Sequence, residues 1–367
     1  MFNNIYNNKK VLVTGHTGFK GGWLSLWLKQ LGAKVYGISN EVYPDPSLYK
    51  VSEINSQVES HIADIRDLNS MLSIIGKIEP DFVFHLAAQP IVKIAFDNPL
   101  DTFNTNIMGT ANVLEAIRRI EKPCIAVMIT SDKCYDNVEW PWGYKETDHL
   151  GGKDPYSASK GAAELIIKTY FHSFFKKQGK IKIASVRAGN VIGGGDWADS
   201  RIVPDCFRAW AKGDKVIIRS PNSTRPWQHV LEPLSGYLQT GQLLYNPDKV
   251  NINGEAYNFG PPTDQNYTVL DLLRQLAINW DNQNADILQI ESGDFPESGL
   301  LKLNIDKSLF HMEWKPTLNF NETAKFTSDW YQAYYKSNEV NMLDFTKDQI
   351  SEYIIVAQRK GILWSLK

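Results

Sequence analysis

The chain has 367 residues, of which 43% are hydrophobic, and its 39 basic and 41 acidic side chains leave a formal charge of −2. This composition indicates a globular protein with a substantial core and, at this length, one large or two ordinary domains. The near-neutral charge gives no reason to expect nucleic acid or an anionic membrane as a partner. Any anionic ligand must therefore be held by local donors and cations.

The compartment is indicated by the N-terminal segment and by the cysteines. Residues 1–10 are polar and lead at once into the apolar run 11–13, which is not the pattern of a signal peptide. No apolar stretch reaches the ~18 residues that span a bilayer. Cys124, Cys134 and Cys206 have neither redox nor zinc spacing and are expected to be free thiols. We expect a cytoplasmic protein without a bound metal.

In the first half of the chain, short apolar runs alternate with amphipathic stretches. Buried strands rich in Val and Ile are predicted at 10–14, 34–38, 81–86, 125–131 and 181–187. Helices are predicted at 22–31, 67–78, 99–120 and 155–176. This alternation predicts an α/β protein with a Rossmann-type, doubly wound parallel sheet that helices cover on both faces.

After residue 187 the alternation weakens. The three glycines at 193–195 predict a flexible or tightly turning loop, and a stretch containing Pro and Trp follows. Later elements are predicted as a helix at 231–244, a strand at 256–259 and helices at 268–279 and 321–336. We expect residues 1–190 and 230–260 to form the Rossmann domain, and 191–229 and 261–343 to form a smaller substrate-binding lobe over the carboxyl edge of the sheet. Residues 344–367 are expected to be a C-terminal tail without an assignable role.

A glycine-rich turn separates the first predicted strand from the first helix. Gly15, Gly18 and Gly21 have the spacing GxxGxxG, with Thr17, Phe19 and Lys20 between them. Side chains at the glycine positions would keep the backbone away from a pyrophosphate, and the following helix would offer its free N–H groups. Glycine clusters also serve tight turns for steric reasons alone, but the position after the first strand favours a dinucleotide site.

Three further segments would complete that dinucleotide site. The second strand ends at Asn40 without an arginine for a 2′-phosphate, which favours NAD over NADP. Asp64 and Ile65, after a third strand candidate, would suit the adenine. Leu86, Ala87 and Ala88 would form a wall beside the cofactor, although small apolar residues there are also compatible with ordinary strand-end packing.

Tyr156 and Lys160 are the strongest chemical signal in the chain. Their spacing of four residues places both on one face of a helix that begins after Asp154-Pro155. An ammonium beside a phenol favours the phenolate, so we expect a lowered pKa for Tyr156 and a role as a base. Ser131, at the end of a predicted strand, would complete a Ser–Tyr–Lys set. Alone, such a pair would be interpreted as a surface contact; together with the glycine turn, chance becomes a poor explanation.

These motifs together resemble the extended branch of the short-chain dehydrogenase/reductases, and within it the sugar-nucleotide 4,6-dehydratases. The Asp132-Lys133 pair after Ser131 is similar to that of the CDP-glucose 4,6-dehydratases, whereas most dehydratases of this branch carry Asp-Glu. Further blocks agree at 84–90, 105–110, 185–197 and 225–233, and the resemblance covers about residues 9–343.

The resemblance implies an NAD-dependent lyase that acts on CDP-glucose, in deoxysugar biosynthesis for surface polysaccharide. Tyr156, with Lys160 and Ser131, would remove the proton of the 4-hydroxyl as NAD accepts the C4 hydride. Water would leave across C5 and C6, with Asp132 as the acid, before the hydride returns to C6. Lys133 as the C5 base is a hypothesis, because a lysine needs a lowered pKa for that role; its alternative is charge pairing with Asp132.

The same resemblance places the substrate in the second half of the chain and implies a homodimer. The residues expected to bind the nucleotide sugar are Gln89, Asn190, Arg201, Arg219, Arg225 and His229. Arginine suits a diphosphate because its planar fork binds two oxygens at once, whereas His229 is as readily structural. Trp197, Trp210 and Trp227 are expected to be core residues, one of which could stack on the base. The dimer would form through helices near 104–119 and 156–175.

Two other functions stay open at this point. A sugar-nucleotide 4-epimerase or decarboxylase would share the glycine turn, Tyr156 and Lys160, but would not be expected to carry Asp132-Lys133. A dinucleotide-binding sensor without catalysis would have no need of the complete Ser131, Tyr156 and Lys160 set. The identity of the nucleotide base rests on the resemblance alone.

Overall fold

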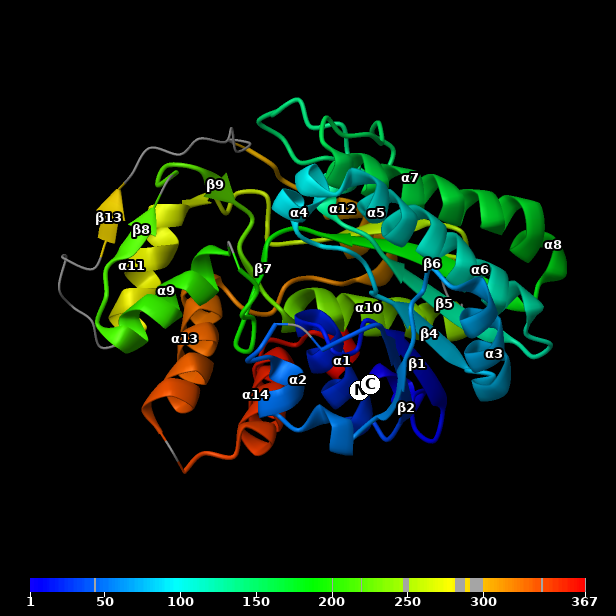
Figure 1. Cartoon of the computed structure of the whole chain (residues 1–367), viewed down its shortest axis with the longest axis horizontal. Helices are drawn as coiled ribbons and strands as arrows, with labels where there is room; N and C mark the ends of the chain where they lie inside the picture. Colours follow the sequence, from blue (N-terminus) through cyan, green and yellow to red (C-terminus); the bar gives the residue numbers. More distant parts are fainter. Residues whose placement is uncertain are drawn as a thin grey trace.

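The computed structural model describes residues 1–42, 44–199, 201–218, 220–246, 251–280, 288–290, 300–337 and 339–366. Its centre is a seven-stranded parallel sheet with the order β11-β6-β5-β4-β1-β2-β3 (Figure 1). The strands are β1 (Lys10–Thr14), β2 (Lys34–Ser39), β3 (Glu59–Ile62), β4 (Phe82–His85), β5 (Cys124–Ile129), β6 (Ile181–Ala188) and β11 (Ala256–Phe259). All six predicted strands lie in this sheet, so the Rossmann-type fold is confirmed. The seventh, β3, is the strand candidate that precedes Asp64, and its side chains are largely exposed.

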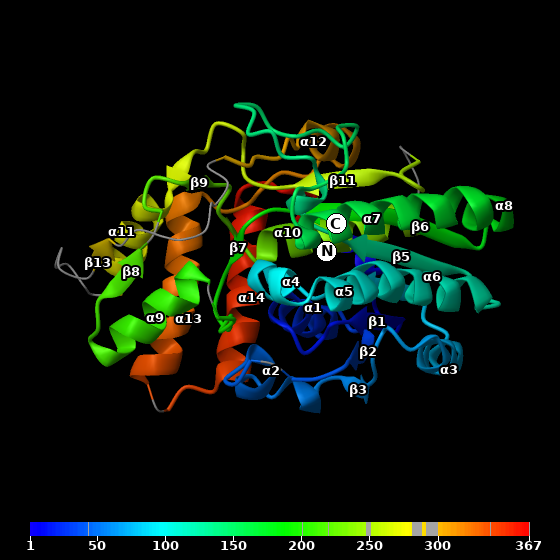
Figure 2. The same ribbon diagram turned by 45° about the horizontal axis from the view of Figure 1, so that its top comes forward.

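Two apolar cores cover the two faces of the sheet. Val11 and Val13 of β1 point into one core and Leu12 points into the other, as the period of two in a strand requires. On the first face lie α1 (Phe19–Gln30) and α10 (Leu231–Tyr245). On the second lie α3 (Leu68–Ile78), α6 (Gly109–Arg119) and α7 (Pro155–Tyr170), and Figure 2 shows α6 and α7 side by side there.

The strand order reverses between β1 and β4, and this places a crevice at their carboxyl ends. β1 continues through α1 to β2 on one side, whereas β4 and β5 lie on the other. His85, at the end of β4, ties the two strands together: its Nδ1 lies 2.8 Å from Thr14 Oγ1, and its Nε2 lies 3.1 Å from Thr110 Oγ1 of α6. Doubly wound sheets bind ligands at such a switch point.

Both long predicted helices contain a π-helical turn. The predicted helix at 99–120 consists of α5 (Pro99–Phe103), a π-helical turn at Asn104–Met108 and α6. The predicted helix at 155–176 consists of α7, a π-helical turn at Phe171–Phe175 and α8 (Lys176–Gln178). Such turns locally shift the helix register, which sequence periodicity does not reveal.

The second half of the chain builds a smaller lobe beside the sheet, at the left of Figure 1. Its main helices are α9 (Ile202–Lys212), α11 (Val269–Asn279) and α13 (Phe320–Lys336). Short strand pairs accompany them: β7 (Val191–Ile192) with β10 (Gln228–His229), β8 (Val216–Ile218) with β13 (Leu288–Ile290), and β9 (Thr224–Arg225) with β12 (Tyr267–Thr268). Other short helices are α2 (Leu48–Val51) and α4 (Val92–Asp97) in the first half of the chain, and α12 (Asp306–Met312) in the second.

Most of the segment predicted as a C-terminal tail is helical and packs on the first domain. α14 (Met342–Arg359) contacts α1 and α13, and α15 (Leu363–Leu366) follows it. Trp364 stacks on Phe2 with ring centroids 5.1 Å apart and on Tyr353 at 5.7 Å. The two ends of the chain therefore lie side by side, as Figure 1 shows.

The triple-glycine segment at 193–195 is a tight turn that joins the two lobes. A Cβ atom on Gly194 would lie 2.0 Å from the Trp330 side chain of α13. Trp23 of α1 donates its Nε1–H to the Gly194 carbonyl at 2.9 Å. Only glycine allows the backbone to pass between these two rings.

The described part of the chain holds no helix that is long and apolar enough to cross a membrane. Its three cysteines are buried free thiols. Over the same residues, no three His, Cys, Asp or Glu side chains gather in a way that could hold a metal ion.

Candidate active site

The glycine turn between β1 and α1 has no room for side chains. Gly15 has a φ of +77°, and a Cβ atom there would lie 2.8 Å from the backbone nitrogen of Ala87. A Cβ atom on Gly21 would lie 2.0 Å from the Gly15 carbonyl oxygen. Leu86 and Ala87 thus form a wall directly beside the turn. α1 begins at Phe19 without a side-chain cap, so its first N–H groups are available to an anion at the crevice.

The ends of β2 and β3 supply a polar edge to the same crevice. His16, next to the turn, lies 3.0 Å from Ser39 Oγ and 2.7 Å from Ser60 Oγ through its two ring nitrogens. Thr17 donates its hydroxyl to the Glu41 carbonyl at 2.6 Å. The predicted cofactor residue Asn40 is exposed immediately after β2.

The two residues predicted to meet the adenine differ in their surroundings. The Asp64 carboxylate accepts hydrogen bonds from Arg66 Nε at 2.9 Å and Nη2 at 2.6 Å, and these bonds hold its pKa below the ordinary range. Ile65 is buried, and it fills the space that a Cβ atom on Gly109 would need. Arg66 is thus committed to acidic partners, Asp64 and Asp101.

Tyr156 and Lys160 lie on the same side of α7, as their spacing predicts. Pro155 opens the helix, and Asp154 caps it by accepting the Ser157 N–H at 2.9 Å. Both side chains are buried, and Lys160 Nζ lies 5.8 Å from the centre of the Tyr156 ring.

The expected lowering of the Tyr156 pKa is wrong for this structure. Burial raises the pKa of Tyr156 to about 12, because the phenolate would lose its hydration; Ser131 and Arg201 oppose that rise. Burial also lowers the pKa of Lys160 to about 8, with the Lys20 ammonium as the next cause. The four-residue spacing correctly placed Lys160 near Tyr156, but burial decides the direction of the Tyr156 pKa shift.

Asp132 has the surroundings of a proton donor. It opens the short 3₁₀ turn Asp132–Cys134 after β5, and its Oδ1 accepts the Ser131 hydroxyl at 2.8 Å. Its buried Oδ2 has no hydrogen-bond partner among the described residues. Burial raises the pKa of this carboxyl, while Lys133, Ser131 and Lys20 oppose the rise. A raised pKa favours the protonated carboxyl, which is the form that general acid catalysis uses.

Lys133 and Lys20 bring positive charge to Asp132 from two segments. Lys133 is half-buried, and its backbone N–H donates to Ser131 Oγ at 3.2 Å. Lys20 reaches the same cluster from the glycine turn: burial lowers its pKa to about 8, followed by the effect of Arg201, while Asp132 and Asp196 raise it. The sequence indicated Lys20 only as a cofactor residue, since nothing local shows that its side chain approaches Asp132.

Of the described arginines predicted to hold a diphosphate, Arg201 is the one whose charge acts on the Tyr156 cluster. Its Nη1 pairs with Asp196 Oδ2 at 2.7 Å, and its charge acts on both Tyr156 and Lys20. Arg225 is half-buried and donates to the Thr224 carbonyl at 2.9 Å. Asn190 is half-buried where β7 begins. Arg219 lies outside the described residues.

Gln89 and His229 are held by the protein itself. Gln89 donates its side-chain amide to Thr102 Oγ1 at 2.9 Å and accepts the Ile91 N–H at 2.5 Å. His229 is fully buried between the rings of Trp23 and Phe326, and its Nδ1 accepts the Leu231 N–H at 3.3 Å. Burial lowers the pKa of His229 to about 3, which agrees with the structural interpretation. Trp197, Trp210 and Trp227 are also buried, as predicted for core residues.

Sequence reasoning missed two groups that support the helix carrying Tyr156 and Lys160. Asn106, in the first π-helical turn, donates to Ser159 Oγ at 2.8 Å and to the Gln89 carbonyl at 3.1 Å. Glu164 and Arg187 form an ion pair buried below Lys160. The available signal was periodicity, because Glu164 follows Tyr156 and Lys160 at the same four-residue spacing.

The parallel sheet, the glycine turn and the buried Ser131, Tyr156 and Lys160 side chains define an enzyme of the short-chain dehydrogenase/reductase type. More narrowly, the chain belongs to the GDP-mannose 4,6 dehydratase family, whose model matches residues 12–327.

Similarity to known proteins supports the membership of this family. The CDP-glucose 4,6-dehydratase of Salmonella typhimurium is 43% identical over 97% of this chain and 99% of its own length. The dTDP-glucose 4,6-dehydratase of Streptomyces venezuelae, solved with NAD, shares the fold at a TM-score of 0.73 and 18% identity, over 88% of this chain and 97% of its own. The UDP-glucuronic acid 4-epimerase of Bacillus cereus, solved with UDP-glucuronic acid and NAD, does so at 0.74 and 22%, over 89% of this chain and all of its own.

Proposed function

We propose that the protein is a CDP-glucose 4,6-dehydratase, which converts CDP-D-glucose to CDP-4-keto-6-deoxy-D-glucose and water. The observation that carries this proposal is the buried Asp132 carboxyl, whose Oδ2 has no partner among the described residues and which stands beside Tyr156 and Lys133. A 4-epimerase needs no such acid. The 43% identity to the Salmonella enzyme over nearly the whole chain supports CDP-glucose as the substrate.

The crevice fits NAD as the cofactor. The turn at Gly15 and Gly21 excludes side chains, and the uncapped start of α1 offers N–H groups to a pyrophosphate. The end of β2 carries Asn40 and no arginine for a 2′-phosphate. When bound, NAD would accept the hydride from C4 of the sugar and return it to C6.

Tyr156 would remove the proton of the sugar 4-hydroxyl. The Lys160 ammonium, whose Nζ lies 5.8 Å from the centre of the Tyr156 ring, would favour the phenolate form, and Ser131 lowers the Tyr156 pKa. Because burial raises the pKa of Tyr156 to about 12, this base depends on neighbouring groups that favour the phenolate, of which Arg201 acts by its charge from the second lobe.

Asp132 and Lys133 would carry out the elimination. The 4-keto group acidifies the C5 proton, which Lys133 would accept in its neutral amine form as the C5–C6 double bond forms. Asp132 gives its proton to the 6-hydroxyl, which leaves as water. Burial raises the pKa of Asp132, which favours the protonated form that this step uses.

Arg201, with Asn190 and Arg225, would hold the diphosphate in the second lobe, and Arg219 is proposed for the same role. Gln89 would support the substrate from the first domain, through a side chain fixed by Thr102. Residues 191–229 and 261–343 would thus form the substrate lobe, with 1–190 and 230–260 as the NAD domain. The 4-keto-6-deoxy product suits deoxysugar biosynthesis for surface polysaccharide in the cytoplasm.

A homodimer would use the outer faces of α5, α6 and α7. Large apolar side chains are exposed along this stretch: Leu100 on α5, Leu165 on α7, and Met108 and Phe174 in the two π-helical turns. Such a surface favours association with a second copy. We expect Leu165→Glu to shift sedimentation from dimer to monomer; wild-type protein that sediments as a monomer would contradict this interface.

The decisive experiment is a substrate panel of CDP-, dTDP- and UDP-glucose and GDP-mannose with NAD, in which product masses are measured. We expect loss of one water from CDP-glucose alone. A product of unchanged mass with an inverted C4 would identify an epimerase instead, and loss of water from another nucleotide sugar would correct the substrate. Tyr156→Phe, for which we expect a strongly reduced rate, serves as the control for contaminating activity.

The role of Lys133 is tested by isotope exchange. In deuterated water, the wild-type product should carry deuterium at C5, and Lys133→Met should lose most of this incorporation while it still oxidises C4. Undiminished C5 labelling in Lys133→Met would reject Lys133 as the base. Lys145→Met, on the exposed loop that follows, is the matched control.

A further inference from the structure

A fully buried ion pair lies directly behind the catalytic side chains. Arg187 at the end of β6 and Glu164 on α7 are only 3% and 4% exposed. Arg187 donates from both Nε and Nη2 to the two carboxylate oxygens of Glu164, each at 2.8 Å. This two-pronged geometry fixes the relative position of the helix and the strand, because both donors lie in one rigid plane.

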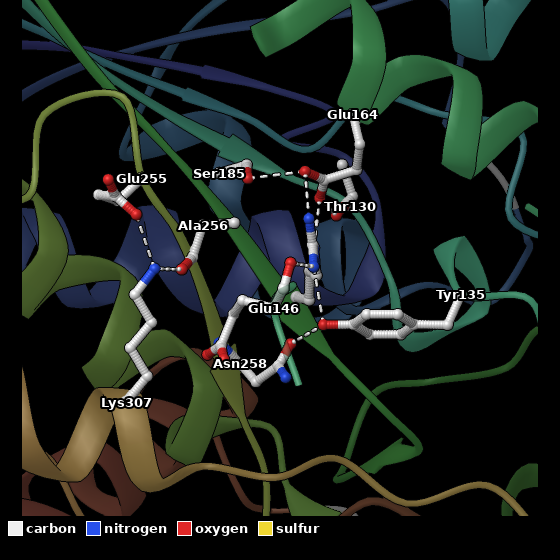
Figure 3. Close-up of polar contacts among 10 residues, drawn as sticks. Thr130, Tyr135, Glu146, Glu164, Ser185, Glu255, Ala256, Asn258 and Lys307 are labelled. Carbon is white, nitrogen blue, oxygen red and sulfur yellow. Dashed lines mark hydrogen bonds and ion pairs between the residues drawn. The ribbon is translucent and has the colours of Figure 1, made fainter. Parts of the chain in front are cut away.

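Each partner of this pair has further bonds to the sheet. The Glu164 carboxylate also accepts the hydroxyl groups of Thr130 and of Ser185, the latter at 2.8 Å; Figure 3 shows both side chains pointing toward it. Burial alone would raise the pKa of Glu164, but Arg187 and these donors hold it below the ordinary value. The carboxylate is therefore charged and fully bonded where β5, β6 and α7 meet.

The remaining nitrogen of Arg187 reaches the segment that follows β5. Its Nη1 donates to the Tyr135 hydroxyl at 2.7 Å and to the Glu146 carbonyl at 3.3 Å. Tyr135 donates in turn to Asn258 Oδ1 at 2.8 Å, and Figure 3 shows Tyr135, Glu146 and Asn258 around this point.

Several of these contacts adjoin a proposed catalytic group. Thr130 precedes Ser131, and Tyr135 ends the turn that carries Asp132 and Lys133. Glu164 lies one helical turn after Lys160 and two turns after Tyr156. Gly189, two residues after Arg187, packs so closely on Asp132 that a Cβ atom there would lie 2.9 Å from its Oδ2.

We propose that Glu164 and Arg187 are positioning residues, which hold the Ser131–Asp132–Lys133 segment and the Tyr156–Lys160 helix at the separation that the reaction requires. The inference rests on the catalytic roles proposed above. Neither residue exchanges a proton with the substrate. Both act through the backbone segments that they join, and the pair does so without contact with solvent.

The test is Glu164→Gln, which keeps the shape of the side chain and removes its charge. We expect kcat for CDP-glucose to fall about 30-fold with KM changed less than about threefold, since small displacements of reacting groups cost rate rather than binding. Arg187→Lys, which retains the charge without the planar fork, should lose less rate than Arg187→Gln. Should Glu164→Gln fold poorly, the double variant Glu164→Gln/Arg187→Gln also removes the Arg187 charge that would be left unpaired. We expect the same fall in kcat for this double variant.

A double-mutant cycle separates positioning from general stability. If Glu164 acts through Tyr156, adding Glu164→Gln to Tyr156→Phe should slow the rapid-mixing rate of C4 oxidation by less than about threefold. Glu232→Gln is the matched control: Glu232 is a buried carboxylate that accepts the Thr317 and Leu318 N–H groups at 2.8 and 2.7 Å, far along the chain from the catalytic segments. It should lower Tm but leave kcat unchanged.

Two results would overturn the inference. One is a wild-type kcat for Glu164→Gln at a temperature where the variant is fully folded. The other is that Glu164→Gln lowers the rate of Tyr156→Phe by the same factor by which it lowers the wild-type rate, as expected for two independent sites. Failure of wild-type protein to dehydrate CDP-glucose would instead reject the proposed function, and the ratio of variant to wild-type rates would then be measured on the nucleotide sugar that the panel identifies.

Discussion

The two lobes bury different kinds of side chain. Where β5, β6 and α7 meet, the buried groups are ionisable: Asp132, Lys160, Glu164 and Arg187. The core of the second lobe is aromatic, with Trp197 and Trp330 in edge contact at 5.4 Å and Phe207 stacked on Tyr331 at 4.2 Å. Burial in the first region shifts pKa values, whereas burial in the second yields apolar packing. We therefore expect substitutions in the first region to change the rate and its pH dependence, and those in the second to change stability.

The largest effect is expected for Tyr156→Phe. Loss of the base should lower kcat for CDP-glucose by about 10⁴-fold, equivalent to roughly 5.5 kcal/mol. Tm should change little, because the phenol is buried at the edge of the site and the ring stays in place. Steady-state kinetics and thermal melting of the same preparation check both statements, and turnover at the wild-type rate would end the assignment of Tyr156.

The opposite outcome is expected for Trp330→Ala in the second lobe. Trp330 is fully buried, and its Nε1–H donates to Thr346 Oγ1 at 3.0 Å. Truncation should lower the free energy of unfolding by about 4 kcal/mol while kcat of the folded protein stays within about twofold, measured by urea denaturation and by kinetics well below Tm. Trp142→Ala, at a side chain 58% exposed, is the control and should have little effect on stability. A large loss of kcat in folded Trp330→Ala would show that the two lobes are not independent in this way.

The sequence could predict the features that follow local patterns, but not those that depend on contacts between distant segments. The sheet and the Ser131, Tyr156 and Lys160 set follow local patterns: apolar runs for β1, β4 and β5, and four-residue spacing on one helix. Contacts between distant segments follow no local rule, so the approach of Lys20 to Asp132 and the stacking of Trp364 on Phe2 were not foreseen. The direction of the Tyr156 pKa was missed for the same reason, because burial depends on the whole fold.

A third, smaller effect is expected for Asp132→Asn, which should act on rate and stability in opposite directions. Without a proton to give, the variant should lose about 10²-fold in kcat. In the wild type, kcat should fall as pH rises through the raised pKa of Asp132, and this dependence should be absent from the variant.

The stability of Asp132→Asn follows from proton linkage. The folded-state pKa of Asp132 is raised above the ordinary 3.8, so the folded protein binds this proton more tightly than the unfolded chain does. The stability contributed by the group is fully present below pH 3.8 and is lost as pH rises through the raised value. The variant should therefore gain stability relative to the wild type between acid and neutral pH, measured by denaturation over that range. A stability difference between variant and wild type that is equal at every pH would mean that the folded-state pKa of Asp132 is not raised.

The smallest effect concerns Arg201, which belongs to both regions. It precedes α9 of the second lobe, yet its charge acts on Tyr156 and Lys20 of the first. If it holds the substrate diphosphate, Arg201→Met should raise KM for CDP-glucose about tenfold, as expected for loss of a charged hydrogen bond. Arg208→Met, on the same helix and paired with Asp205, is the control and should leave KM unchanged. A fall in kcat at constant KM would instead mean that Arg201 serves the Tyr156 phenolate, which would extend the ionisable region across the boundary between the lobes.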